Sequence, residues 1–140
     1  MRKKVLWLAV LALLLVCVSC ARENGPAVNG NGELSVTVPV GFENVTISVH
    51  GNIFLAITKK DFQAAGFQFG DTVRVSFWQY NLEMPVCRDY GDVAEGENVC
   101  LMKDDKGCVT LAINGSSFAE KYGISEDKLP RVTITRIEKE

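Results

Sequence analysis

The sequence predicts an all-β domain, mainly antiparallel and closed into a sandwich or barrel, with two short helices. Short segments in which apolar and polar residues alternate, separated by Gly and Asp, run through most of the chain. In addition, residues 51–68 and 107–124 resemble each other at a constant offset, which aligns Phe62 with Phe118. Each copy is typical of a strand, a short helix and another strand, so the pattern predicts an internal two-fold repeat. We expect both Phe side chains to point from their helices into one shared core.

Seven segments have the periodicity of half-buried strands. In the first of them Leu34, Val36 and Val38 alternate with polar neighbours, and the others repeat this pattern. Because successive side chains of a strand point to opposite faces, such alternation places one apolar face against a core. The predicted strand segments are 33–40, 45–50, 72–78, 82–87, 98–103, 108–113 and 131–137.

The two helices are predicted from their capping residues. Thr58 is a suitable N-cap for a helix that ends at Gly66. Ser116 or Ser117 is a suitable N-cap for a second helix that ends at Gly123. The two helices occupy equivalent places in the predicted repeat.

Residues 1–20 have the pattern of a lipoprotein-type signal peptide that ends at Cys20. Three basic residues precede an apolar run from Val5 to Val18, and the small Ser19 stands before the cysteine. The run is short for a membrane span, which needs about twenty apolar residues. We expect Cys20 to carry lipid and to anchor an exported protein to a bilayer of the bacterial cell envelope. The alternative is an ordinary signal peptide cleaved near Ala21.

Residues 21–32 are rich in Gly and Asn and lack apolar periodicity, which predicts a flexible tether. Residues 33–140 are then a single β domain, long enough for one core. The whole chain has 15 basic and 17 acidic residues and a formal net charge of −2. This balance gives no electrostatic case for nucleic acid as a partner.

The cysteines that follow the signal are Cys87, Cys100 and Cys108, an odd number. In an oxidising compartment we expect one disulfide and one free thiol, and Cys100 with Cys108 is the favoured pair because the two flank a turn. The alternative is three buried thiols that pack as small apolar groups. His50 is the single histidine and has no ligand cluster beside it, so the sequence predicts neither a metal site nor a cofactor.

The region that contains the second copy carries a motif of a known family. The residues of the motif are Tyr90, Asp92, Val93, Gly96, Glu97, Gly107, Ala112, Asn114, Gly115, Ser116, Ala119, Glu120, Gly123 and Ile124. In order and spacing they resemble the C-terminal β domain of the S-adenosyl-L-methionine hydroxide adenosyltransferase family, which includes the fluorinase and chlorinase. An F-G-N motif of that family corresponds here to His50, Gly51 and Asn52.

The resemblance implies a ligand site but not an enzyme. Family enzymes bind S-adenosyl-L-methionine between an N-terminal catalytic domain and the C-terminal domain of a neighbouring subunit. No counterpart of the catalytic domain is expected in this chain, so the resemblance implies a non-catalytic role. The residues it indicates as ligand-binding are Asn52, Tyr90, Lys106, Asn114 and Gly115.

Other interpretations of these residues stay open at this point. Asn52 and Asn114 are also typical of turns, and Tyr90 is also typical of a small β core. Taken together, the signal and the resemblance predict a lipid-anchored module that binds a nucleoside-like or S-adenosyl-L-methionine-related ligand. The alternatives are an envelope domain that docks another protein, and one half of a hydrolase site that a separate catalytic subunit completes.

Overall fold

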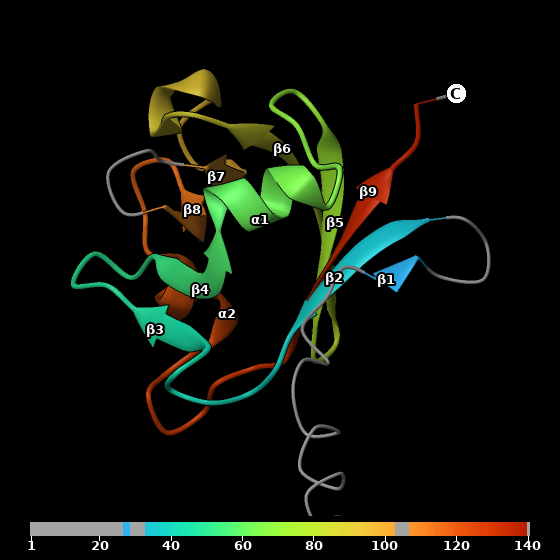
Figure 1. Cartoon of the computed structure of the whole chain (residues 1–140). Helices are drawn as coiled ribbons and strands as arrows, with labels where there is room; N and C mark the ends of the chain where they lie inside the picture. The colour runs from blue at the N-terminus through green and yellow to red at the C-terminus, as the bar shows by residue number, and fades with distance from the viewer. Residues whose placement is uncertain (1–26, 29–32, 103–106, 140) are drawn as a thin grey trace, which may run out of the picture.

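The chain forms one nine-stranded sheet that curls into a nearly closed barrel (Figure 1). The structure is a computed structural model that describes residues 27–28, 33–102 and 107–139. The strand order is β1-β2-β9-β5-β6-β7-β8-β4-β3, and β2 also contacts β4. The strands are β1 (Ala27–Val28), β2 (Leu34–Val38), β3 (Val45–Ile47), β4 (Ile53–Thr58), β5 (Thr72–Phe77), β6 (Tyr80–Cys87), β7 (Asn98–Met102), β8 (Cys108–Ile113) and β9 (Val132–Ile137).

The predicted fold class is confirmed. Each of the seven segments with strand periodicity coincides with one observed strand, and β4 supplies the strand before the first helix. All neighbouring strands pair antiparallel except β6 and β7, in which Val86 lies opposite Cys100 in a parallel pair. The parallel pair is formed because the chain crosses from β6 to β7 through a connection that contains a short 3-10 helix, η1 (Tyr90–Asp92).

The tether predicted for residues 21–32 contains a strand. Ala27 pairs with Ser35, and Val28 pairs with Leu34, so β1 lies antiparallel to β2. The paired part of the domain therefore begins before residue 33. The predicted signal peptide and Cys20 lie outside the described residues. No helix within the described ranges is long and apolar enough to cross a membrane.

Both helices begin at predicted caps. The Thr58 side chain accepts a hydrogen bond of 3.0 Å from the Asp61 N–H at the start of α1 (Lys59–Ala64). The Ser117 side chain accepts one of 3.1 Å from the Glu120 N–H at the start of α2 (Phe118–Tyr122). Of the two serines that the sequence left open, Ser117 is therefore the cap.

Phe62 from α1 and Phe118 from α2 are both fully buried in the same core cluster, as predicted. Phe62 stacks on Phe67, with 4.1 Å between the ring centroids, whereas Phe118 packs against Tyr122 at 4.6 Å. The helix α1 follows β4 directly, but residues 114–117 separate α2 from β8. The internal two-fold repeat stays a prediction, because the two copies differ at this junction.

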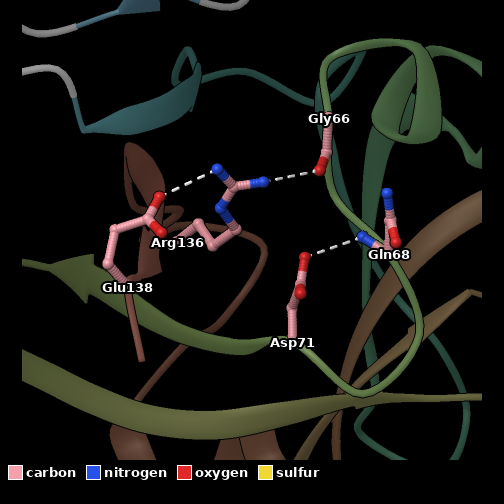
Figure 2. Close-up of polar contacts among 5 residues, drawn as sticks. All are labelled: Gly66, Gln68, Asp71, Arg136 and Glu138. Carbon is pink, nitrogen blue, oxygen red and sulfur yellow. Dashed lines mark hydrogen bonds and ion pairs between the residues drawn. The ribbon is translucent and has the colours of Figure 1, made fainter. Parts of the chain in front are cut away.

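Arg136 on β9 ties the chain after α1 to the last strand (Figure 2). Its Nη1 donates a hydrogen bond of 2.9 Å to the Gly66 carbonyl, and its Nη2 forms an ion pair of 2.8 Å with Glu138. In the same loop Asp71 accepts a hydrogen bond of 2.8 Å from the Gln68 N–H. These contacts hold the connection between α1 and β5 against the end of β9.

The predicted disulfide between Cys100 and Cys108 is not formed. Cys87, Cys100 and Cys108 are all free thiols. Cys100 lies opposite Leu111 in the β7–β8 hairpin, three positions beyond Cys108, so the two cysteines are not cross-strand neighbours. Cys100 instead packs in the main core, where burial raises its pKa to about 12.

Candidate functional site

A hollow of about 430 Å³ opens where the β3–β4 turn, η1 and the turn after β8 meet. Its volume lies in the range of small-molecule pockets. Three stretches that are distant in sequence contribute to it, which is typical of a site built by the fold. The lining residues are His50, Asn52, Tyr90, Ile113, Asn114, Gly115 and Ser116.

The β3–β4 turn places Asn52 in this hollow. The Ser48 hydroxyl accepts hydrogen bonds from the His50 and Asn52 N–H groups, at 3.3 and 3.1 Å. Gly51 has φ of +78°, and a Cβ at this position would come within 1.9 Å of the Ser117 Oγ. Its carbonyl accepts a hydrogen bond of 2.9 Å from the Ala119 N–H. Glycine is required here because the backbone is left-handed and presses against the start of α2.

Asn52 and Tyr90 are joined directly. The Asn52 Nδ2 donates a hydrogen bond of 2.9 Å to the Tyr90 hydroxyl. Asn52 is only 7% exposed, so this bond satisfies a donor that has little access to water. The bond fixes the amide plane of Asn52 relative to the aromatic ring.

The Tyr90 ring rests on a second, smaller core cluster on the outer face of β7 and β8. Val99, Leu101 and Ala112 form this cluster, and Val93 also packs on it. The Asp92 carboxylate accepts hydrogen bonds from the N–H groups of residues 88 and 89, at 3.2 and 3.1 Å, and thereby closes the η1 turn. Tyr90 is therefore held at its ring face by packing and at its hydroxyl by Asn52.

Asn114 is anchored to the connection between η1 and β7. Its Nδ2 donates a hydrogen bond of 2.9 Å to the Val93 carbonyl. Its N–H donates to the Glu97 carbonyl at 3.1 Å, and its carbonyl accepts from the Gly96 N–H at 2.8 Å. These three bonds leave Asn114 with a structural role as well as a place in the lining. Gly115 follows with φ of +79°.

Among the residues that the structure describes, no Lys, Arg, Asp, Glu or Cys lines the hollow. It offers amide, hydroxyl and backbone groups that can both donate and accept hydrogen bonds, together with the apolar surface of Ile113 and the Tyr90 ring. Within the part of the chain that the structure describes, no group of three or more His, Cys, Asp and Glu side chains is arranged to hold a metal ion. Such a lining offers hydrogen-bonding groups and an apolar surface that can recognise a small polar ring system.

Four of the five predicted ligand residues come together in this hollow, namely Asn52, Tyr90, Asn114 and Gly115. Lys106 lies outside the described residues. The described residues on either side of it, Met102 and Gly107, lie at the other end of the β7–β8 hairpin from Asn114. Asn114 lies in the turn after β8, and its side-chain amide braces this turn through the bond to the Val93 carbonyl. Its role in ligand binding stays a prediction.

Ile113 and Ser116 also line the hollow, although the sequence did not indicate either of them as ligand-binding. Ser116 is itself a residue of the family motif, and Ile113 lies directly before Asn114 of that motif. Ser48 and Ser117 shape the Gly51 turn, and the sequence indicated this role for neither of them, although Ser117 was a candidate helix cap. Their role depends on the approach of the β3–β4 turn to α2, and this contact spans more than sixty residues of sequence.

A second hollow, of about 330 Å³, lies between the α1–β5 loop and the end of β9 (Figure 2). Both positive and negative side chains line it, including Arg136, Lys139, Asp71 and Glu138. The Arg136–Glu138 ion pair and the Gln68–Asp71 hydrogen bond already engage several of these groups. This hollow is therefore a surface depression with internal polar contacts, and the first hollow is the better candidate site.

The chain matches a known protein family and is similar in fold to a solved structure. A family model described as the SAM hydroxide adenosyltransferase C-terminal domain matches residues 45–129, which include every residue of the first hollow. A solved structure, an uncharacterized conserved protein from Thermotoga maritima, is similar with a TM-score of 0.59 and 20% identity. The match covers 81% of this chain and 40% of that protein, so the chain spans about two fifths of its length. At this identity the likeness concerns the fold alone.

Proposed function

The chain belongs to the SAM hydroxide adenosyltransferase C-terminal domain family, and on this premise we propose that it is a non-catalytic binding module for a nucleoside-like or S-adenosyl-L-methionine-related ligand. The observation that supports the proposal most strongly is the convergence of Asn52, Tyr90, Asn114 and Gly115 on one hollow. The family resemblance in the sequence indicates all four residues as ligand-binding, and they come from three separate turns.

The chemistry of the hollow suits a heteroaromatic base. An Asn side chain has two donors and one acceptor oxygen, which can pair with the donor and acceptor edge of a purine. The Tyr90 ring provides an apolar face, and the backbone at Gly115 can approach a ligand closely because no Cβ intervenes. The hollow is open to water, so we expect weak binding, on the order of 10 μM to 1 mM.

A non-catalytic role is supported by the residue types in the site. The resemblance assigns activation of the hydroxide or halide to the N-terminal domain of the family enzymes, and the matching model describes the C-terminal domain. No described residue of the lining carries a carboxylate or a thiol, and the groups that remain for acid–base or nucleophilic chemistry are the His50 imidazole and the hydroxyls of Tyr90 and Ser116. Burial, followed by the nearby Asp92 carboxylate, raises the pKa of Cys87, which makes this thiol a poor nucleophile as well.

We propose further that Cys20 carries lipid and that the domain is held at a membrane of the cell envelope. The basic start, the apolar run and Cys20 support this part of the proposal. Twelve residues separate Cys20 from Glu33, so the folded domain would stay within tens of Å of the bilayer surface.

Titration calorimetry of the full chain in a non-ionic detergent tests the binding function. The probes are adenosine, methionine and S-adenosyl-L-methionine, each up to millimolar concentration. We expect saturable binding of at least one adenosyl compound, and its loss in Asn52→Ala. Asn81→Ala is the matched control, since Asn81 lies on β6 and bonds to Ser76 away from the hollow. Absence of binding by all probes would refute the proposal, and release of adenosine from S-adenosyl-L-methionine would overturn its non-catalytic part.

A second candidate function, docking of another envelope protein, is favoured by exposed apolar side chains. Phe42 is 67% exposed and Val40 is 54% exposed, both in the β2–β3 connection. Trp78, at the β5–β6 turn, is 40% exposed and lies under the Lys128 ammonium at 4.6 Å. Exposed aromatic residues of this kind are common anchors of protein interfaces. Cross-linking in the native envelope with and without Phe42→Ser would test this candidate.

A further inference from the structure

Three connections of the chain lie together at one end of the sheet. Val38 at the end of β2 lies opposite Val132 at the start of β9, and Ser76 near the end of β5 lies opposite Thr133. The β2–β3 connection, the chain before β9 and the β5–β6 turn therefore meet at this end, at the bottom of Figure 1. We call it the loop end, and its residues are 39–44, 78–79 and 125–131.

The loop end carries most of the large apolar side chains that are exposed. In the described part of the chain there are four such side chains, and Val40, Phe42 and Trp78 belong to the loop end. The fourth, Val49, lies in the β3–β4 turn. The Lys128 ammonium lies 4.6 Å from the centre of the Trp78 ring. A Trp ring beside a Lys is typical of the membrane–water interface, where the ring enters the headgroup region and the ammonium stays in water.

The backbone of Trp78 is unusual for an aromatic residue. Within the described ranges it is the single non-Gly residue with a positive φ, of 47°. Two-residue turns between antiparallel strands favour Asn, Asp or Gly at such a position, because these residues tolerate the left-handed conformation. Packing inside the domain gives little reason for a Trp here, since 40% of its surface is exposed. A contact outside the domain supplies such a reason.

The first strand directs the preceding chain toward the loop end. In the antiparallel pair of β1 and β2, Ala27 lies opposite Ser35, and β2 runs from there to Val38. The chain before Ala27 therefore leaves β1 in the direction of the loop end, which begins about 10 Å further along the sheet. Residues 21–26 separate Ala27 from Cys20, and an extended chain of this length spans at most about 25 Å. A lipid on Cys20 thus lies no more than about 15 Å beyond the loop end.

The charges of the loop end nearly cancel. The charged residues within its three segments are all exposed, and they are Glu43, Glu126, Asp127, Lys128 and Arg131. Attraction to anionic lipid is therefore not the main force that would hold this end at a bilayer. Burial of its apolar side chains in the interfacial region remains as the driving force.

We propose that the loop end docks on the phospholipid surface that holds the Cys20 anchor, with Val40, Phe42 and Trp78 inserted among the headgroups. This inference rests on the lipid anchor of the proposed function. The second candidate function gives the same side chains to a protein partner, but the direction of β1 and the short distance to Cys20 favour the bilayer. β3 leads away from the loop end to the turn that carries Asn52, so docking keeps this turn of the first hollow off the bilayer.

Fluorescence of Trp78 in vesicles tests the inference. Trp7 is the other tryptophan, so Trp7→Phe leaves Trp78 as the single reporter in the full chain. The protein is expressed in a bacterial host with the lipoprotein pathway and reconstituted from non-ionic detergent into phosphatidylcholine vesicles, with or without bromine on the acyl chains. We expect brominated lipid to lower the Trp78 emission at least about twofold, because an inserted ring lies near the quencher. Loss of emission that requires phosphatidylglycerol, or that disappears at high salt, would contradict apolar insertion.

Two variants show whether quenching depends on the loop end. Phe42→Ser removes one inserted side chain, and we expect it to reduce the quenching of Trp78 by about half. Val49→Ser removes an exposed apolar side chain from the β3–β4 turn and should leave the quenching unchanged. Vesicle-bound protein with unquenched Trp78 would overturn the docking but keep the anchor, and would leave these side chains to a protein partner. Protein that does not sediment with the vesicles would remove the Cys20 anchor, and this inference with it.

Discussion

Asn52 and Tyr90, 38 residues apart in sequence, meet in a hydrogen bond of 2.9 Å from the Asn52 Nδ2 to the Tyr90 hydroxyl. The bond links the β3–β4 turn to the connection between β6 and β7, two loops at the same hollow. A bond from the buried Asn52 amide to the half-buried Tyr90 side chain fixes the shape of the site before any ligand arrives. We therefore expect the hollow to be pre-formed in the absence of ligand.

Removal of the Tyr90 hydroxyl is expected to destabilise the domain. In Tyr90→Phe the buried Asn52 amide loses its acceptor, and an unsatisfied buried donor costs about 1–3 kcal/mol. Denaturant unfolding measures the change. Tyr80→Phe is the control, since Tyr80 contributes its ring to the aromatic cluster around Phe77, and it should change stability by less than about 0.5 kcal/mol. Equal effects of the two variants would show that the Asn52–Tyr90 bond contributes nothing.

Substitution of Gly51 is expected to disrupt the turn that carries Asn52. Gly51→Ala adds a Cβ that meets Ser117 and forces a residue with a side chain into a left-handed conformation, which together should cost more than about 2 kcal/mol. Gly70→Ala is the matched control. Gly70 also has a positive φ, of +87°, but has open space around it, so only the smaller conformational strain applies. Thermal melts compare the two, and a Gly51→Ala variant as stable as Gly70→Ala would contradict the close approach to α2.

Phe62 and Phe118 should contribute similar amounts to the free energy of unfolding. Phe62→Ala and Phe118→Ala each remove a fully buried ring, which typically costs about 3–5 kcal/mol. Phe42→Ala, at an exposed position, should change stability by no more than about 0.5 kcal/mol. If either core substitution altered the free energy of unfolding by a few tenths of a kcal/mol, the two helices would not share one core.

The buried Cys100 thiol is expected to make the free energy of unfolding fall at high pH. Burial raises its pKa from 9.0 to about 12, so the folded protein keeps the thiol proton in a pH range where the unfolded chain releases it. The protonated thiol therefore contributes fully to the free energy of unfolding below pH 9, and this contribution is lost as the pH rises from about 9 toward 12. Unfolding free energies measured from pH 8 to 11 should fall more steeply in the wild type than in Cys100→Ala. Parallel pH profiles would contradict the buried, protonated thiol.

Lipidation of Cys20 is tested by the location of the protein. The wild-type chain expressed in a bacterial host with the lipoprotein pathway should sediment with membranes, and Cys20→Ala should be released or should stay unprocessed. Cys17→Ala, which changes the other cysteine next to the cleavage region, should not alter the sedimentation. Recovery of a soluble, unacylated wild-type protein would exclude the anchor.

The sequence predicted local features well because local physics determines them. Alternation of apolar residues located the strands, and Thr58 and Ser117 marked the helix starts because their side chains accept hydrogen bonds from nearby N–H groups. It missed β1, since Ala27 and Val28 are too few to show any period. The sequence also could not specify the register between β7 and β8. The disulfide prediction was wrong for this reason, because Cys100 lies opposite Leu111 and not opposite Cys108.

Part of the candidate site could be predicted from the sequence. Asn52, Tyr90, Asn114 and Gly115 were recognisable because a family motif contains them. The contacts that shape the hollow, such as Ser117 against Gly51 and Glu95 over Gly115, arise where separate turns approach each other. Such contacts leave no pattern in a single sequence, so they became visible only in three dimensions.

The most direct test of the central claim is a titration followed by NMR on ¹⁵N-labelled protein. With adenosine or S-adenosyl-L-methionine added, we expect saturable shifts of the Asn52 side-chain amide and the Gly115 backbone amide, with little change at the second hollow around Arg136. In the Asn52→Ala variant, the Gly115 backbone amide should no longer shift when the ligand is added. Resonances of the first hollow that do not move at millimolar ligand, or shifts confined to other parts of the domain, would contradict the account.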